Sequence, residues 1–231
     1  MKIDICIIGA LEEEVEKLIS MLEEKECESV SGMKIYTGRI FDKGVAIARC
    51  GIGKVFAALA AEAMILKYSP RLVVNTGVGG ALDPRLDTCD IVFADRLCQH
   101  DMDTSPLGDP KGLISGINRI YFEADKRAVS ILEQAASELS VNYLVGTIAS
   151  GDRFVASAED KRFITSEFSA VCCEMEGASI AHVAFVNSTP VAVVRAISDR
   201  ADGDASMDYP SFLPIAARTS TQLTLALIKA Y

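Results

Sequence analysis

Short apolar runs alternate with longer amphipathic stretches along the whole chain, and this alternation restricts the folds that the sequence can adopt. The runs IDICII, RLVVN and PVAVVRAI contain few polar residues, which is typical of strands buried on both faces of a sheet. We expect strands over Ile3 to Ile8, Met33 to Ile40, Val45 to Arg49, Leu72 to Thr76, Asp90 to Ala94, Leu144 to Ala149, Ala170 to Glu174 and Val191 to Ile197. We expect helices over Glu12 to Lys25, Val55 to Tyr68, Lys126 to Leu139, Met175 to Phe185 and Tyr209 to Ala230. This order predicts an α/β fold of three layers, with a largely parallel central sheet flanked by helices.

One antiparallel hairpin is also expected, because the runs MKIYTGRI and KGVAIAR are separated only by a short turn around Asp42. The central sheet is therefore predicted to be mixed. No linker, repeat or low-complexity tract interrupts the pattern, so we expect a single domain over residues 1–231. The longest irregular stretch, Gln99 to Arg119, is rich in Gly, Pro and Asp, and a loop of this length in a compact domain is usually functional.

The charge balance limits the partners and the chemistry of the chain. Lys and Arg number 23 against 32 Asp and Glu, so the net charge is -9, which disfavours nucleic acid and anionic membranes as partners. Only two histidines occur, His100 and His182, so any proton transfer falls to carboxylates. We interpret His182 as a packed side chain and His100 as a loop or interface residue. Neither has a plausible set of metal-ligand partners, and we expect no metal and no cofactor.

The cysteines and the N-terminal segment indicate a cytoplasmic protein. Seven cysteines, an odd number without a C-x-x-C pair, are typical of reduced thiols rather than of a disulfide framework. The N-terminal apolar run is short, contains Asp4 and is followed by acids where a signal peptide would have its cleavage site. No stretch reaches the roughly 18 apolar residues that a membrane span requires.

Small and polar residues follow several of the expected strands, and we expect them to form one rim. In open α/β sheets ligands bind beyond the carboxyl ends of the strands, where glycines permit close approach of the backbone. The segments concerned are Gly9-Ala10, Gly51 to Lys54, Gly77 to Gly80, Ser150 to Asp152 and Ser198-Asp199. The segment GIGKVF is neither a dinucleotide fingerprint nor a P-loop, because Phe56 replaces the third small residue and Val55 replaces Ser or Thr.

Three acidic segments lie near this rim, and each has a purely structural alternative. Glu12 to Glu14 open a helix, where the helix dipole favours acids, but together they would repel a phosphate. Glu174 and Glu176 flank Met175 in an apolar setting and need partners or a ligand, although Glu176 also suits a helix cap. Ser198 and Asp199 end an apolar strand, where they either cap a later element or, since desolvation favours the neutral acid, supply a proton.

The motifs together resemble the bacterial 5'-methylthioadenosine/S-adenosylhomocysteine nucleosidases, a family within the purine nucleoside phosphorylase/hydrolase superfamily. The resemblance covers essentially the full length, with motifs in the order of the family: IIGALEEEV, CGIGK, NTGVGGAL, SGDRF, CCEMEGASIAHV and VRAISDRAD. It implies a cytoplasmic homodimer that takes a small adenine nucleoside and releases adenine by hydrolysis, without phosphate or metal. It also implies a role in nucleoside catabolism and methionine salvage.

By motif position, the resemblance assigns Asp199 as the general acid that protonates N7 of adenine. Glu14 is implied as the base that activates water for attack at the ribose C1'. Glu176 would bind the ribose hydroxyls, Ser198 would orient the acid, and Arg195 would lie near the nucleophilic water. Two carboxylates suffice for this chemistry, since cleavage passes through an oxocarbenium-like sugar.

The resemblance further implies a substrate-binding wall made of Met175, Phe154, Val155, Ile52, Val78, Gly79, Tyr209, Phe212 and Leu107. In the family an aromatic ring at Phe154 stacks on adenine and the backbone at Val155 reads its edge. Two departures stand out: Val78 replaces a frequent serine, and Leu107 replaces a frequent aromatic residue. Leu107 belongs to the 99–119 loop, which the resemblance places in the site of the partner subunit.

Three other functions remain as alternatives at this point. A phosphate-dependent nucleoside phosphorylase of the same superfamily is disfavoured by the acids at Glu12 to Glu14. Hydrolysis of a related adenine nucleoside, such as aminodeoxyfutalosine, would use the same adenine and ribose contacts. A non-catalytic binding or storage protein should have lost one of Glu14, Glu176 and Asp199, and all three are present.

Overall fold

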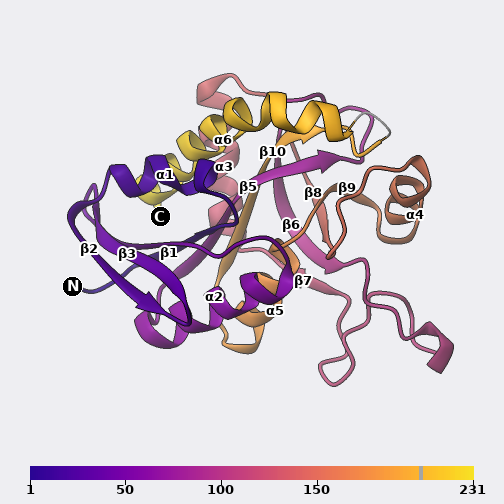
Figure 1. Ribbon diagram of the computed structural model, residues 1–231, viewed down its shortest axis with the longest axis horizontal. Coiled ribbons are helices and arrows are strands. Elements are labelled where there is room, and N and C mark those ends of the chain that lie inside the picture. Colours follow the sequence, from indigo (N-terminus) through magenta and orange to yellow (C-terminus); the bar gives the residue numbers. More distant parts are fainter. Residues whose placement is uncertain (203–204) are drawn as a thin grey trace.

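A single mixed sheet of ten strands runs through the molecule, as Figure 1 shows. This computed structural model describes residues 1–202 and 205–231, without the side chains of residues 205–210 and 214. The strands are β1 (Ile5–Gly9), β2 (Glu23–Val30), β3 (Met33–Ile40), β4 (Lys43–Arg49), β5 (Leu72–Ala81), β6 (Ile91–Gln99), β7 (Tyr121–Glu123), β8 (Tyr143–Ser150), β9 (Ala170–Glu174) and β10 (Val191–Asp199). The helices are α1 (Glu12–Ser20), α2 (Lys54–Tyr68), the short 3-10 helix η1 (Ser105–Leu107), α3 (Lys126–Leu139), α4 (Ala158–Phe168), α5 (Gly177–Val186) and α6 (Ala205–Ala230).

Most strand pairs near the centre of the sheet are parallel. Strand β1 pairs in parallel with β4 and β5, and β5 pairs in parallel with β10. The expected hairpin is present, because β3 pairs antiparallel with β4, and β2 adds to its outer edge. Strand β10 also pairs with β6, which continues through β8 and β9 back to β5, so this half of the sheet closes on itself. The mixed α/β architecture expected from the sequence is confirmed.

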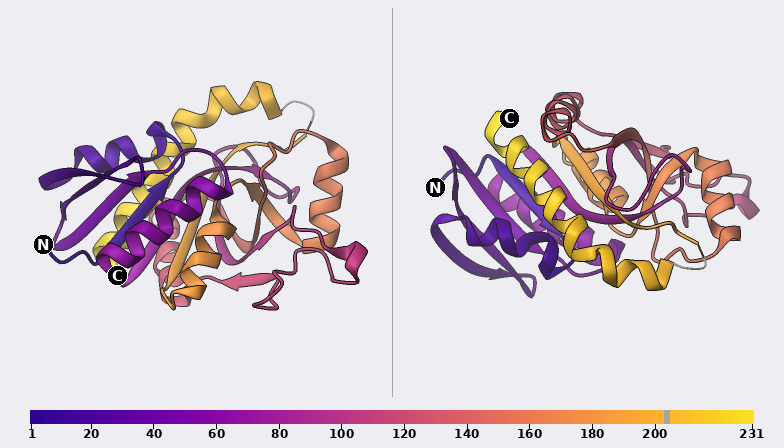
Figure 2. Two further views of the ribbon diagram at one scale, coloured as in Figure 1. Left: turned by 60° about the horizontal axis from the view of Figure 1, so that its bottom comes forward. Right: turned by 90° about the horizontal axis from the view of Figure 1, so that it is seen from above.

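Helices cover both faces of the sheet, with α1, α3 and α6 on one side and α2 and α5 on the other (Figures 1 and 2). Within β1, the side chains of Ile5 and Ile7 pack into the core beneath α1 and α6. Those of Cys6 and Ile8 pack into the core beneath α2 and α5. Successive side chains of a strand point to opposite faces, so a strand covered on both faces needs an unbroken apolar run.

The structure differs from the sequence-based expectation at the end of the first helix and in the presence of β2, α4 and β7. The first helix ends at Ser20 rather than Lys25, because the following residues form β2. Strand β2 reads EEKECESV and is almost wholly exposed, so it lacks the apolar alternation that identifies strands, and its charges protect a free sheet edge. Helix α4 was not expected, although Ser157 caps it by accepting a hydrogen bond from the Asp160 amide. The third missed element, β7, has only three residues.

The topology brings the ends of six strands to one place. Strands β1, β4, β5 and β10 run parallel, so their carboxyl ends share an edge. Strand β9 meets β5 antiparallel through its last residues, with Cys173 opposite Gly80, and this contact brings the ends of β9 and its neighbour β8 to the same edge. Within the part of the chain that the structure describes, no helix is long and apolar enough to cross a membrane.

Candidate active site

A cavity of about 360 Å³ lies at this common edge of the sheet. It is lined by residues in the last part of the strands or shortly after them: Ala10, Leu11, Glu14, Ile52, Val78, Gly79, Gly80, Arg153, Phe154, Val155, Cys173, Glu174, Met175, Glu176, Ser198 and Asp199. Four of the five segments expected to form the rim contribute residues to this cavity, whereas Ser150 to Asp152 lie just outside its lining. Its size suits a nucleoside-sized ligand, since small-molecule sites occupy about 300–1,000 Å³.

Glu14 is fixed in the cavity wall by three backbone amides. Its carboxylate accepts hydrogen bonds from the amides of Ala10 at 2.7 Å, Leu11 at 3.0 Å and Val78 at 3.1 Å. Burial raises the pKa of Glu14 above its ordinary value, and the charge of Arg195 and the three amides oppose that rise. A side chain at Gly77 would bring its Cβ within 2.5 Å of a Glu14 oxygen, so glycine is required there. Glu14 is thus a preorganised, desolvated carboxylate suited to accept a proton.

Asp199 and its neighbour Ser198 both face the cavity because β10 is irregular at its end. In a regular strand, consecutive side chains point to opposite faces. The register with β5 shifts between Ile197 and Asp199, and such bulges re-aim side chains next to active sites. The Ser198 hydroxyl donates to Asp199 Oδ2 at 2.9 Å, and the Ala201 amide donates to Oδ1 at 2.9 Å. The Asp199 carboxyl group is therefore buried but held in one orientation.

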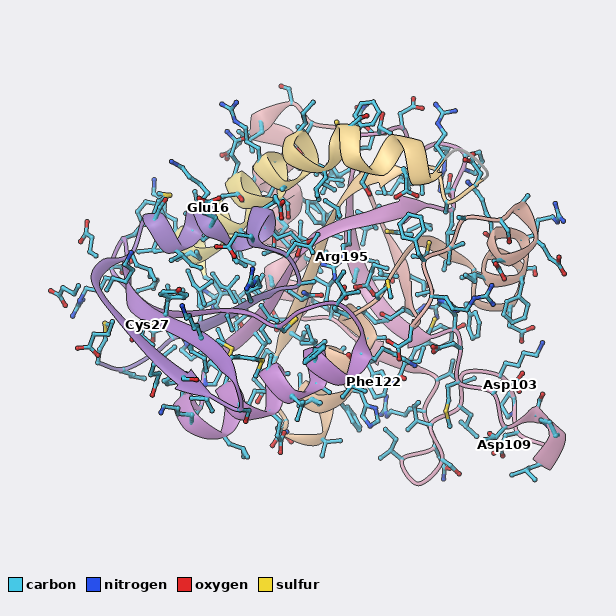
Figure 3. All side chains as sticks on the ribbon, viewed as in Figure 1. Glu16, Cys27, Asp103, Asp109, Phe122 and Arg195 are labelled. Carbon is cyan, nitrogen blue, oxygen red and sulfur yellow. The ribbon has the colours of Figure 1, made fainter. Side chains whose placement is uncertain are left out.

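Behind the cavity, Glu174 forms a fully buried ion pair with Arg195, whose position at the centre of the molecule is labelled in Figure 3. Glu174 Oε2 also accepts hydrogen bonds from the amides of Glu176 at 3.0 Å and Gly177 at 2.7 Å, and Oε1 accepts one from the Ser150 hydroxyl. Burial raises the pKa of Glu174, but Arg195 and these donors outweigh it, so the pKa lies below its ordinary value. Glu174 is therefore held as the anion.

Glu174 rather than Glu176 caps α5, which settles an alternative that the sequence left open. The two backbone amides at the start of α5 bind Glu174, and the Glu176 side chain makes no capping hydrogen bond. Glu176 instead accepts a hydrogen bond at 2.7 Å from the amide of Gly53, at the start of α2. Burial, with a smaller contribution from the charge of Glu174, raises the pKa of Glu176 to about 8. Glu176 is free to meet a ligand and is largely protonated at neutral pH.

The outer part of the cavity is apolar and open. Phe154 is 47% exposed and Ile52 is 55% exposed, although both line the cavity, whereas Val155 is buried. Large apolar side chains left partly uncovered beside a pocket mark a surface that a ligand or partner completes. Arg153 is the only cation among the described residues that line the cavity, and it pairs with Asp160 at 2.8 Å.

Three of the predicted site residues, all within the described part of the chain, do not line the cavity. Arg195 lies behind it, paired with Glu174. Leu107 is 84% exposed in the loop that carries Asp103 and Asp109 and projects from the body of the molecule in Figure 3. Phe212 is half-buried on α6, and the side chain of Tyr209 lies outside the described residues. All other predicted site residues meet in the one cavity.

Two residues that organise the site were not among the site residues predicted from the sequence. Asn75 lies in the middle of β5, where its Oδ1 accepts a hydrogen bond from Arg195 and its Nδ2 donates to the Ile8 carbonyl at 2.9 Å. Ser150 links Glu174 to the Ala178 amide at 2.7 Å. A buried polar residue within the apolar run RLVVN was the available signal for Asn75.

The predicted packing role of His182 agrees with its surroundings. Its ring stacks on Phe122 with centroids 5.0 Å apart, and burial lowers its pKa. His100 is buried against Gly151, and its Nε2 has no hydrogen-bond partner among the described residues. No group of three or more His, Cys, Asp or Glu side chains in the described ranges is arranged to hold a metal ion.

Comparison with known proteins places this cavity in a family context. Residues 4–229 match the model of the phosphorylase superfamily. A 5'-methylthioadenosine/S-adenosylhomocysteine nucleosidase of Staphylococcus aureus (strain JH9) is 38% identical over 225 residues, which are 97% of this chain and 98% of that protein. A mutant of the Helicobacter pylori nucleosidase, crystallised with 5'-methylthioadenosine in its active site, superposes with a TM-score of 0.96 at 34% identity and covers 100% of both chains. The futalosine hydrolase of Helicobacter pylori strain 26695 superposes with a TM-score of 0.95 at 34% identity, over 99% of this chain and 98% of that one.

Breaking the buried ion pair should cost far more stability than breaking an exposed one. We expect Arg195→Met to lower the free energy of unfolding by about 3–5 kcal/mol, because it leaves the buried Glu174 anion uncompensated. The matched control is Arg200→Met, whose pair with Asp87 is exposed and should contribute about 0–1 kcal/mol. Urea unfolding of both variants checks this, and equal losses would contradict it.

The raised pKa of Glu176 predicts a pH-dependent effect on stability. Folded Glu176 keeps its proton up to about pH 8, whereas the unfolded chain loses it near 4.5, so the folded state binds more protons in between. The contribution of Glu176 to the free energy of unfolding is therefore greatest below about pH 4.5 and declines as pH rises towards 8, by up to about 1.4 kcal/mol per pH unit. Glu176→Gln keeps an oxygen for the Gly53 amide but has no carboxyl group to titrate, so the free energy of unfolding of this variant lacks that decline.

The measurement is the Tm of the wild type and of Glu176→Gln at pH 5, 6, 7 and 8. We expect the Tm of the variant minus that of the wild type to increase across the series, by roughly 3–5 °C per pH unit at most for a chain of this size. A difference that stays constant or shrinks with pH would show that burial does not hold the proton on Glu176.

Proposed function

This chain belongs to the phosphorylase superfamily, and from that membership and the geometry of its cavity we propose that it hydrolyses the N-glycosidic bond of 5'-methylthioadenosine and S-adenosylhomocysteine. The enzyme is then an N-glycosyl hydrolase that releases adenine and a 5-thioribose product. The observation that carries the proposal is that two buried carboxyl groups, Glu14 and Asp199, line one nucleoside-sized cavity while held by different partners.

The proposed reaction needs one proton donor and one proton acceptor. Asp199 donates its proton to N7 of adenine, and the bond between C1' and N9 breaks with its electron pair moving to the base. The sugar becomes an oxocarbenium-like cation. Water attacks C1' while Glu14 accepts a proton from it, which completes hydrolysis with neutral adenine as the leaving group. Both carboxyl groups return to their starting states by proton exchange with solvent.

The other residues of the cavity suit the two halves of the substrate. The half-exposed ring of Phe154 offers a face on which adenine stacks, beside the buried Val155. The protonated Glu176 has both a donor and an acceptor for the ribose hydroxyls, and Met175 lines the cavity next to it. Ile52, at the open side, offers an apolar contact for the alkylthio group.

The charges around the cavity favour water over phosphate as the nucleophile. The buried Arg195 is paired with Glu174, and Arg153 is paired with Asp160, so neither is a free cation for phosphate. The Glu14 carboxylate occupies the three amides that an anion would otherwise use. A phosphate at this place would meet a fixed negative charge, which makes phosphorolysis the less favourable reaction.

A second adenine nucleoside remains a candidate substrate. The Helicobacter pylori futalosine hydrolase is as similar in fold as the nucleosidases. The related nucleoside that the sequence left open is aminodeoxyfutalosine. Such a substrate would present the same base and ribose and differ only at the 5' substituent. The open side of the cavity at Ile52 is the place where the two substrates would be distinguished.

The direct test is adenine release by the purified protein from methylthioadenosine, adenosylhomocysteine and aminodeoxyfutalosine, with adenosine and inosine as comparisons. We expect release from methylthioadenosine and adenosylhomocysteine at the same rate with and without inorganic phosphate. Asp199→Asn and Glu14→Gln should each lower that rate by at least about a hundred-fold, since each removes a general acid or base. Their Tm values should stay close to that of the wild type.

Three outcomes would overturn parts of this proposal. Adenine release that requires phosphate would make the enzyme a phosphorylase. Exclusive turnover of aminodeoxyfutalosine would move the substrate assignment to that nucleoside. Near-normal turnover by either carboxylate variant would remove that residue from its assigned role.

We also infer that the chain acts as a homodimer joined through α2 and α5. Helix α2 is apolar on its outer side as well, where Val55 is 70% exposed, Phe56 54% and Leu59 48%, and Val186 of α5 is 61% exposed. A soluble monomer rarely exposes so much contiguous apolar surface. In such a dimer, the projecting loop with Leu107 extends towards the cavity of the partner.

We expect the wild type to sediment with twice the mass of one chain and Leu59→Asp to sediment with the mass of a single chain, because a carboxylate on this face would be desolvated at the interface. The matched control is Leu139→Asp, which is 44% exposed at the end of α3 and should leave the dimer intact. A monomeric wild type would contradict the inference.

A further inference from the structure

A compact polar cluster made of Lys54, Asp101 and Asp152 joins two loops that line the cavity to the loop that follows β6. Lys54 opens α2, which follows β4, Asp101 follows β6, and Asp152 follows β8. Lys54 and Asp152 belong to the motifs CGIGK and SGDRF, and Asp101 lies in the 99–119 loop. The reaction proposed above uses none of the three side chains. Their arrangement therefore requires a separate explanation.

The three residues form a closed set of contacts. Lys54 Nζ donates to Asp101 Oδ1 at 2.6 Å, and the Asp152 amide donates to Asp101 Oδ2 at 2.9 Å. The Lys54 amide donates to Asp152 Oδ1 at 2.8 Å. The side chains of Lys54 and Asp101 are only 17% and 24% exposed, so their ion pair is shielded from solvent and is stronger than a typical surface pair.

The cluster lies directly behind residues that face the substrate cavity. Ile52 and Arg153 line the cavity, whereas Lys54 and Asp152 line a separate groove against α2 and α5. Between them, the amide of Gly53 donates to Glu176. Two consecutive amides therefore bind carboxylates on opposite sides of the chain. The Gly53 amide binds Glu176 in the cavity, and the Lys54 amide binds Asp152 behind it.

The start of α2 depends on Asp152 for its cap. The residue at the capping position is Gly53, which has no side chain and a φ of +99° that only glycine adopts readily. Free amides at a helix start need an acceptor, and Asp152 supplies it from another loop. A Cβ at residue 53 would lie 3.0 Å from Asp152 Oδ1, so the glycine also makes room for this contact.

We propose that Asp152 and Asp101 are positioning residues that fix the Phe154 loop against the start of α2, and thereby set the spacing between the adenine wall and the ribose-binding Glu176. This role rests on the proposed function only for the identity of the substrate. Losing the contact loosens a wall that binds substrate and transition state alike. The effect is therefore expected mainly in KM rather than in kcat.

Asp101 has the charge state that this role requires. Burial raises its pKa, but the hydrogen bonds from Lys54 and from the Asp152 amide outweigh burial, so the pKa of Asp101 lies below its ordinary value. It is therefore the anion throughout the neutral range. The contact with Lys54 is then a charge-assisted hydrogen bond over the whole pH range of an activity assay.

The test compares two aspartates that each cap one helix. Asp152→Ala removes the cap of α2 beside the cavity, and Asp125→Ala removes the cap of α3, where Asp125 accepts from the Ala128 amide at 2.7 Å. Both variants should lose similar stability, about 2–4 °C in Tm. Only Asp152→Ala should raise the KM for methylthioadenosine, by about ten-fold, since a charged hydrogen bond is lost behind the binding wall. Its kcat should change by less than about three-fold, because the interaction is made equally with the bound substrate and with the transition state.

A conservative variant and a measurement without substrate complete the test. Asp152→Asn keeps an oxygen for the Lys54 amide and should restore KM to within about two- to three-fold of the wild type, because neutral acceptors are weaker than charged ones. Hydrogen exchange of the amides of residues 51–55 and 151–155 should accelerate in Asp152→Ala and Asp101→Ala and stay unchanged in Asp125→Ala.

These readouts separate failure of the positioning role from failure of the proposed function. A wild type that releases no adenine would overturn the function, while hydrogen exchange would still report on the loops. The positioning role is overturned if Asp152→Ala leaves both KM and exchange as Asp125→Ala does. It is also overturned if Asp152→Asn is as impaired as Asp152→Ala.

Discussion

The buried ion pair between Arg195 and Glu174 is the interaction on which the candidate site depends. Isolated charges in a protein core are costly, and this pair is tolerated because each partner has further hydrogen bonds, with Asn75 on the side of the arginine and Ser150 on the side of the carboxylate. By binding the first amides of α5, Glu174 removes the need for Glu176 to act as a cap. The pair therefore contributes chiefly by leaving a second carboxyl group available to a ligand.

Three buried carboxyl groups with one intrinsic chemistry acquire different properties from their surroundings. Glu174 faces a guanidinium and several donors and stays ionised, whereas Glu176 has one amide and a neighbouring anion and holds its proton to about pH 8. Burial raises the pKa of Glu14, while three amides and the charge of Arg195 oppose that rise. A chain with two histidines can in this way provide a charged anchor, a neutral hydrogen-bonding group and a proton acceptor within one cavity.

The central architecture followed from the sequence because burial on both faces imposes unbroken apolar runs, as in β1, β5 and β10. The polar residues after these strands also met as expected, since parallel strands share an edge. Strand β2 escaped prediction because an exposed edge strand needs no apolar face. The capping role of Glu174 was not predicted, because Glu174 and Glu176 lie in the same apolar segment and only their hydrogen-bond partners distinguish them. Leu107 was assigned to a substrate site only through the family resemblance, and in the described chain it is exposed and outside the cavity.

In the proposed reaction Asp199 protonates the leaving base while Glu14 acts on the water, and a change of leaving group separates these two roles most directly. A 4-nitrophenyl 5-methylthioribofuranoside releases a phenolate that needs no proton from the enzyme. The measurement is nitrophenolate release by the wild type, Asp199→Asn and Glu14→Gln. We expect Asp199→Asn, which is strongly impaired on methylthioadenosine, to cleave this substrate at a rate close to that of the wild type, whereas Glu14→Gln should be strongly impaired on both substrates. Equal loss of both activities in the two variants would contradict the assignment of acid and base.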